Sequence, residues 1–120
     1  RQFAMSATVR VMYWLPHCST CQKAEAYLKD LGVTIDHAHD LKATPIAPEA
    51  LQQLVEGIGG AEALFSKRAM KYRSLGLDKQ QLSAEQMIEH MLAEYTFIKR
   101  PALLLSDGRV LAGFSAKQYK

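Results

Sequence analysis

The chain has 120 residues, enough for one domain with a buried core. Hydrophobic residues make up 48% and charged residues 22%, which excludes a disordered or collagen-like chain. The net charge of +3 allows an anionic ligand but does not indicate binding to nucleic acid, and we expect none. No apolar run approaches the roughly 20 residues of a membrane span, so we expect no membrane association.

The chain carries two cysteines, Cys18 and Cys21, which excludes a secreted mini-protein built on several disulfides. Residues 1–7 lack the apolar core of a signal peptide. Met5 resembles a natural start, so we interpret residues 1–4 as left over from expression and 1–7 as a disordered start. Without an export signal we expect a cytoplasmic protein, whose thiols are kept reduced.

The first elements form a strand, a helix and a strand. Residues 8–14 are rich in branched and aromatic side chains and predict a strand. From Ser19 the pattern is helical and stops at Gly32. Residues 33–39 alternate as a second strand, which predicts a βαβ unit with a right-handed crossover.

The middle of the chain is helical. Pro48 suits the first turn of a helix that ends at Gly57 or at the glycine pair 59–60. A second helical stretch is expected over 61–75, closed by Gly76.

Ser83 and Gln86 have the spacing of a capping box, which predicts the start of a third helix in this middle segment. Residues 102–105 then predict a strand. A two-residue turn at 107–108 leads to a last strand over 110–114.

Residues 117–120 begin a last helix. The element order predicts an α/β chain with a thioredoxin-like fold (β-α-β … β-β-α) that carries an inserted helical segment. We expect a single domain over 1–120. Its thioredoxin-like core comprises 8–45 and 95–120, and the helical insertion comprises 46–94.

The two cysteines lie where a strand gives way to a helix. Cys18 falls at about the N-cap, where free N–H groups and the helix dipole stabilise a thiolate. Cys21 follows one turn later on the same side. A disulfide between them would close a very small loop and stabilise the fold little, so the pair is better suited to reversible redox chemistry. Cys18 is then the solvent-reachable nucleophile and Cys21 the more buried resolving thiol.

Two other interpretations of the cysteine pair stay open. The thiols could be buried and inert, or they could form half of a zinc site with His17 and with His37 or His39. His17 could instead lower the thiol pKa or simply be a solvated turn residue. His37 and His39 are treated as structural or exposed. We expect no metal.

Basic residues gather in two places. One group is consistent with a solvated helix face and comprises Lys67, Arg68, Lys71 and Arg73. Lys99 and Arg100 differ, because Arg100 directly precedes Pro101 at the start of a strand.

Three segments together resemble the ArsC/Spx family: residues 13–24 (YWLPHCSTCQKA), 66–76 and the Ile-Lys-Arg-Pro sequence at 98–101. The resemblance covers residues 8–119, and the Arg-Pro pair at its distance from Cys18 is the most specific element. Members include glutaredoxin-coupled arsenate reductases and the Spx regulators, which bind the α subunit of RNA polymerase.

The resemblance implies roles for individual residues. Cys18 matches the catalytic cysteine of the reductases, Cys21 the second redox cysteine of Spx, and Arg100 an arginine that binds an oxyanion. Ser66 and Gly113 fall where the reductases carry two further arginines, which puts arsenate as a substrate in doubt.

A second set of residues follows from the same resemblance. Candidates for holding an oxyanion or stabilising the thiolate are Ser19, Thr20, Lys67, Arg68 and Pro101. Pro101 is expected to be cis and to face the redox cysteine. Gly60 falls near the glycine that Spx uses at its polymerase contact.

Two functions follow for this chain. The first is a thiol–disulfide oxidoreductase without a bound cofactor, reduced by glutathione or by glutaredoxin or thioredoxin, with arsenate or a disulfide as substrate. The alternative is an Spx-like regulator that binds the RNA polymerase α subunit and is switched by the Cys18–Cys21 disulfide.

Overall fold

The computed structural model describes residues 8–119, so the expectation for residues 1–7 lies outside the described part. In chain order the elements are β1 (Val9–Trp14), α1 (Ser19–Asp30), β2 (Ile35–Asp40), α2 (Pro48–Ile58), α3 (Ala61–Leu64), α4 (Met70–Ser74), η1 (Leu77–Lys79), α5 (Ala84–Ala93), η2 (Tyr95–Phe97), β3 (Ala102–Leu105), β4 (Val110–Ala112) and α6 (Ala116–Tyr119). None of the helices in this part of the chain has the length and apolar character to cross a membrane.

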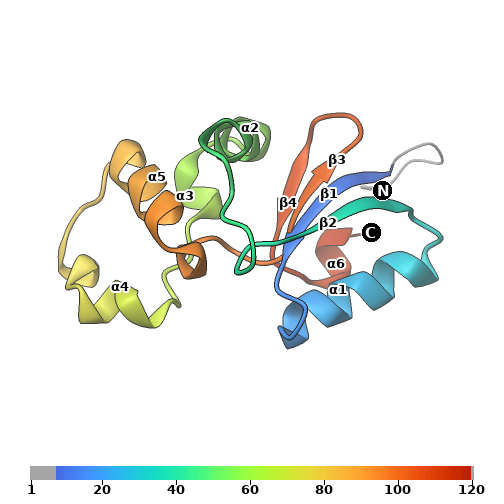
Figure 1. The fold of residues 1–120 in the computed structure, drawn as a ribbon, viewed down its shortest axis with the longest axis horizontal. Helices are drawn as coiled ribbons and strands as arrows, with labels where there is room; N and C mark the ends of the chain where they lie inside the picture. The colour runs from blue at the N-terminus through green and yellow to red at the C-terminus, as the bar shows by residue number, and fades with distance from the viewer. Residues whose placement is uncertain (1–7, 120) are drawn as a thin grey trace.

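The four strands form one mixed sheet in the order β2-β1-β3-β4. β1 runs parallel to β2 and antiparallel to β3, and β4 completes a hairpin with β3. Figure 1 shows α1 and α6 on one side of this sheet, with α2 on the other and α3–α5 in a second, helical lobe. The arrangement is the expected thioredoxin-like α/β fold, with α2–α5 as the inserted helices.

Each face of the sheet has its own buried core. Neighbouring strand residues point to opposite faces. Met12 and Leu103 therefore belong to the cluster under α1 and α6, while Tyr13 and Leu104 belong to the larger cluster with the inserted helices. The sheet thus anchors the helical lobe on one side and the helix that begins at the cysteines on the other.

The prediction of one helix over residues 61–75 is wrong. The chain leaves the helical conformation at Phe65, which forms an antiparallel bridge with Ile98, and α3 and α4 are separate short helices. The backbone N–H of Ser66 donates to the carbonyl of Phe97 at 2.7 Å. These non-local hydrogen bonds replace the helical ones, because a backbone group bonded to a distant strand cannot also continue a helix.

The turn between β3 and β4 also differs from the expected two residues at 107–108. The Leu105 carbonyl accepts from the Gly108 N–H at 3.0 Å, and the Leu105 N–H donates to the Arg109 carbonyl at 2.9 Å. With Gly108 at φ 92°, this is a three-residue loop that ends in a left-handed glycine. β4 then stops before Gly113, which has φ 76°, rather than running to residue 114.

The predictions that rest on local sequence signals at helix ends are confirmed. The Ser83 side chain accepts from the Gln86 N–H at 3.1 Å, and the Gln86 side chain accepts from the Ser83 N–H at 2.9 Å. α2 begins at Pro48 and ends at Ile58, and its C-cap is Gly59, whose φ of 93° suits only glycine well.

Candidate active site at the start of α1

The loop between β1 and α1 places the first thiol at a helix start. The Cys18 N–H donates to the Leu15 carbonyl at 3.1 Å, which closes a turn, and the Gln22 side chain donates to the Pro16 carbonyl at 2.9 Å. Cys18 is the N-cap of α1, as expected, with extended backbone angles. Its sulfur therefore lies beside the unpaired N–H groups of the first helical turn. His17, next to it, is exposed.

Cys18 has the properties of a reactive thiol. Its side chain is partly exposed, and partial burial alone would raise its pKa. Four interactions outweigh that burial: hydrogen bonds from the Cys21 N–H, the Cys21 thiol and the Thr20 N–H, and the positive charge of Arg100. Together they hold the pKa of Cys18 below its ordinary value, so a larger fraction of this thiol is nucleophilic thiolate.

Cys21 has the opposite character. It is completely buried, and burial raises its pKa to about 12, although a hydrogen bond involving the Leu15 backbone acts in the other direction. Cys21 therefore keeps its proton near neutral pH and donates it in a hydrogen bond to the Cys18 sulfur. The pair combines one accessible thiolate with one protected thiol in direct contact.

Arg100 lies in the segment just before β3, after the inserted helices. Its Nη1 donates to the carbonyls of Ile98 at 3.0 Å and Thr96 at 3.3 Å. Its Nε is buried and makes no hydrogen bond to any described residue. The Arg100–Pro101 bond is cis, as predicted, and Arg100 is directed to the site rather than to open solvent.

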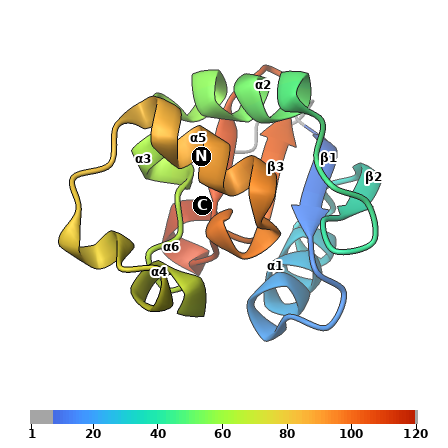
Figure 2. The ribbon, with the colours of Figure 1, turned by 60° about the vertical axis from the view of Figure 1, so that its left-hand side comes forward.

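Cys18 opens onto a cleft of about 660 Å³ between the start of α1, the chain that joins α3 to α4, and the residues before β3. Figure 2 shows α4 and the start of α1 on the same lower side of the molecule. The cleft brings together five residues predicted for the site: Cys18, Thr20, Lys67, Arg68 and Arg100. Lys67 and Arg68 therefore do not lie on a solvated helix face, because the chain is not helical there.

Four other predicted residues do not line this cleft. Cys21 is completely buried, Ser19 is exposed in the first turn of α1, and Pro101 is buried. Gly60 lies between α2 and α3.

The cleft also has lining residues that sequence reasoning did not assign to it. Phe65 and Ile98 lie almost completely buried at the cleft, Phe114 is partly exposed in it, and Lys99 adds a further cation. Phe65 and Ile98 come together only through their bridge, a contact that no local pattern shows.

The histidines do not join the cysteines. The Nε2 atom of His39 lies 2.7 Å from the Thr44 carbonyl, and its ring contacts the rings of Tyr13 and His37. Within residues 8–119 no group of three or more His, Cys, Asp or Glu side chains is arranged to hold a metal ion.

The chain is similar to known proteins over most of its length. A model of the ArsC family matches residues 13–120. The uncharacterized protein YusI of Bacillus subtilis strain 168 is 34% identical over 112 residues, which is 90% of this chain and 92% of YusI. The global transcriptional regulator Spx of Lactiplantibacillus plantarum is 23% identical over 111 residues, covering 92% of this chain and 83% of Spx. The solution structure of an arsenate reductase (ArsC) related protein from Brucella melitensis is 30% identical, with a TM-score of 0.72, over 98% of this chain and 93% of that one.

Proposed function

Because the chain belongs to the ArsC family, we propose that it is a cytoplasmic thiol–disulfide redox protein in which Cys18 is the nucleophile and Cys21 resolves the adduct. The observation that carries this proposal is the contrast between the two thiols. One is accessible with a lowered pKa, and the other is buried, protonated and hydrogen-bonded to it.

The proposed reaction moves two electrons from the protein to its substrate. The Cys18 thiolate attacks one sulfur of a substrate disulfide, forms a mixed disulfide and releases the other sulfur as a thiolate. Cys21 then loses its proton and attacks the Cys18 sulfur, which forms the Cys18–Cys21 disulfide and releases the second substrate thiol. Glutathione, glutaredoxin or thioredoxin would return the protein to the dithiol form.

Arsenate is the proposed alternative substrate of the same thiols. The Cys18 sulfur would displace one arsenate oxygen as water, and attack by Cys21 or glutathione on that sulfur would release arsenite, with arsenic reduced from +5 to +3 and two thiols oxidised to a disulfide. Arg100 supports this step, since its guanidinium lies beside the thiol and its Nε has no hydrogen-bond partner among residues 8–119. Thr20, Lys67 and Arg68 stand around the same space, as groups that hold an anion should.

A second candidate function is an Spx-like regulator, and it rests on the similarity to Spx over most of both chains. In this proposal the Cys18–Cys21 disulfide switches a surface that binds the RNA polymerase α subunit. Gly60, half-buried between α2 and α3, is then the contact residue to test.

One experiment separates the candidates. Arsenate reduction is measured with glutathione and glutaredoxin, reduction of a small disulfide is measured without arsenate, and binding to the C-terminal domain of the polymerase α subunit is measured with oxidised and reduced protein. The redox proposal predicts disulfide turnover that disappears in Cys18→Ser. Redox-dependent binding without turnover would favour the regulator, and failure of both Cys18 reactivity and binding would contradict the two proposals.

A further inference from the structure

The cleft beside Cys18 is larger and less polar than a single tetrahedral oxyanion needs. Its volume of about 660 Å³ lies within the roughly 300–1,000 Å³ typical of sites for organic ligands. Its lining includes the partly exposed side chain of Phe114, while Phe65 and Ile98 are almost completely buried. An oxyanion held at Arg100 and Cys18 would fill only a small part of this volume and would not contact Phe114, so the size of the cleft favours a larger occupant with carbon atoms.

The charge of the cleft is strongly one-sided. Four cationic side chains line it, Lys67, Arg68, Lys99 and Arg100, against one carboxylate, Glu62. Glu62 forms an ion pair of 3.6 Å with Lys67, and both side chains are largely exposed. Such an exposed pair is weak and gives way readily to a ligand.

Besides Arg100, two of the cations form no ion pair with the described part of the chain. Within residues 8–119 neither Arg68 nor Lys99 takes part in an ion pair. Both side chains are exposed, and they stand on different segments, one between α3 and α4 and the other just before β3. Charges on two walls of one cleft fit an extended ligand that carries more than one negative group.

The segment that follows Lys67 and Arg68 is also basic and carries an exposed apolar side chain. Met70 is 89% exposed at the start of α4, and Arg73 in α4 is an exposed cation without an ion pair in the described chain. A basic segment with an exposed apolar side chain, directly after Lys67 and Arg68, suits a polypeptide that extends beyond the cleft.

We propose that the cleft docks an acidic polypeptide segment that carries a cysteine, and that Cys18 exchanges disulfides with this cysteine. The inference rests on the proposed thiol–disulfide function and names its substrate class. The Cys18 thiolate forms a bond to the peptide sulfur and breaks the disulfide that this sulfur made with a leaving thiol, which departs as a thiolate. Arg68 and Lys99 attract the acidic residues on either side of the peptide cysteine.

The test uses the full chain and three short peptides. Each peptide carries one cysteine as a mixed disulfide with 2-thiopyridine, and the peptides differ only in whether the flanking residues are glutamate, glutamine or lysine. Release of the thiopyridine gives the rate of attack by Cys18. We expect the glutamate peptide to react about tenfold faster than the glutamine peptide and the lysine peptide to react slowest. At about 1 M salt, where charges are screened within about 3 Å, the three rates should converge.

Variants assign the preference to the cleft. In the double variant Arg68→Gln/Lys99→Gln, the ratio between the glutamate and glutamine peptides should fall to between one and three. Arg10→Gln, which removes an exposed arginine at the start of β1, is the matched control and should keep both rates. Equal rates for all three peptides, or a preference that survives in the double variant, would overturn the inference while leaving the proposed function in place. A Cys18 that reacts with none of the peptides would overturn both.

Discussion

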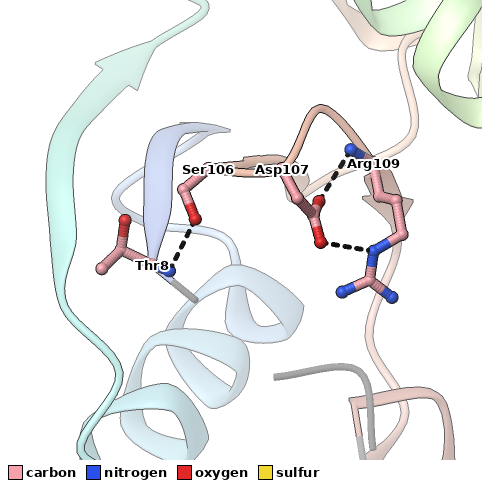
Figure 3. A network of polar contacts seen from close by, with 4 residues as sticks. All are labelled: Thr8, Ser106, Asp107 and Arg109. Atoms are coloured by element: carbon pink, nitrogen blue, oxygen red, sulfur yellow. Dashed lines mark hydrogen bonds and ion pairs between the residues drawn. The ribbon is translucent and has the colours of Figure 1, made fainter. Parts of the chain in front are cut away.

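An arginine lies at each end of the β3–β4 hairpin, Arg109 at the turn and Arg100 at the opposite end, and the two have different hydrogen-bond partners. At the turn, Arg109 donates from Nε to the Asp107 carboxylate at 2.9 Å, and its N–H donates to the same carboxylate at 3.0 Å. The Thr8 N–H donates to the Ser106 hydroxyl at 3.1 Å beside it (Figure 3). At the other end, Arg100 has two backbone carbonyls as partners and no carboxylate among residues 8–119.

This difference separates a structural arginine from one that is available to a substrate. A carboxylate beside a guanidinium offsets part of its charge, as Asp107 does for Arg109. Backbone carbonyls orient Arg100 without neutralising it, and its buried Nε stays unpaired within the described chain. The thiol end of the sheet therefore keeps a positive charge that the turn end does not have.

The largest effect should come from the nucleophile. Cys18→Ser should abolish disulfide exchange, because the hydroxyl that replaces the thiol is not ionised near neutral pH. Cys21→Ser should keep the first attack and stop the second, so that the mixed disulfide on Cys18 accumulates. Mass spectrometry of the intact protein after reaction with a small disulfide measures both. A mixed disulfide that formed on Cys21 in the wild-type protein would contradict the assignment.

The next largest effect is expected on the reactivity of Cys18 when the two arginines are replaced in turn. Arg100→Gln should raise the pKa of Cys18, since it removes a positive charge that favours the thiolate, and should slow alkylation by iodoacetamide near neutral pH by about two- to tenfold. Arg109→Gln should leave the alkylation rate unchanged. Alkylation measured across pH gives the pKa of Cys18 in both variants.

The lowered pKa of Cys18 also predicts how the stability of the fold changes with pH. A pKa lowered in the folded state means that the Cys18 thiolate stabilises the fold above the ordinary thiol pKa, and that this contribution is lost as pH falls through the lowered value. Cys21 has the opposite effect, because its pKa in the folded protein is raised to about 12. As pH rises beyond the ordinary thiol pKa, the unfolded chain loses this proton more readily than the folded one, and the fold becomes less stable. Equal alkylation rates for wild type and Arg100→Gln at every pH would remove Arg100 from the site.

A substitution at the turn end should change stability without changing the thiols. Alanine at Gly57 would place its Cβ 2.6 Å from a methyl group of Val110 and 2.7 Å from the Gly108 carbonyl. Gly57→Ala should therefore destabilise the fold by about 1–3 kcal/mol, despite the better helix propensity of alanine. Denaturant unfolding measures this, with the exposed Gln53→Ala in the same helix as control. A lowered thiol reactivity in Gly57→Ala would show that the two ends are coupled.

The elements that could be predicted from the sequence are those with a local cause. Cys18 as N-cap follows from the β-prone run, the proline at 16 and the helical pattern after it, and the capping box at Ser83 follows from spacing alone. Both thiol environments followed from that helix position, because the N-cap faces solvent and the residue one turn later faces the core.

What could not be predicted depends on contacts between distant residues. Phe65 looks helical in sequence, and only its pairing with Ile98 after the inserted helices breaks the helix there. That break turns Lys67 and Arg68 into the cleft, so their place in the site could not follow from the basic pattern. The three-residue turn at Gly108 depends on the pairing of β3 with β4, which an Asp-Gly sequence does not specify.

The smallest expected effect is the change in the free energy of unfolding when Cys18 and Cys21 are oxidised to a disulfide. A Cys18–Cys21 disulfide closes a loop of four residues, and loop-closure entropy gives such a loop only about 2 kcal/mol. The thiolate interactions that lower the pKa of Cys18 are lost on oxidation, which offsets part of that gain. Denaturant unfolding of the oxidised and reduced protein should therefore differ by less than about 2 kcal/mol, with Cys21→Ser unaffected by the oxidant as the control. Stabilisation by several kcal/mol on oxidation would make the bond structural, since a disulfide that the fold favours so strongly would resist reduction back to the dithiol form.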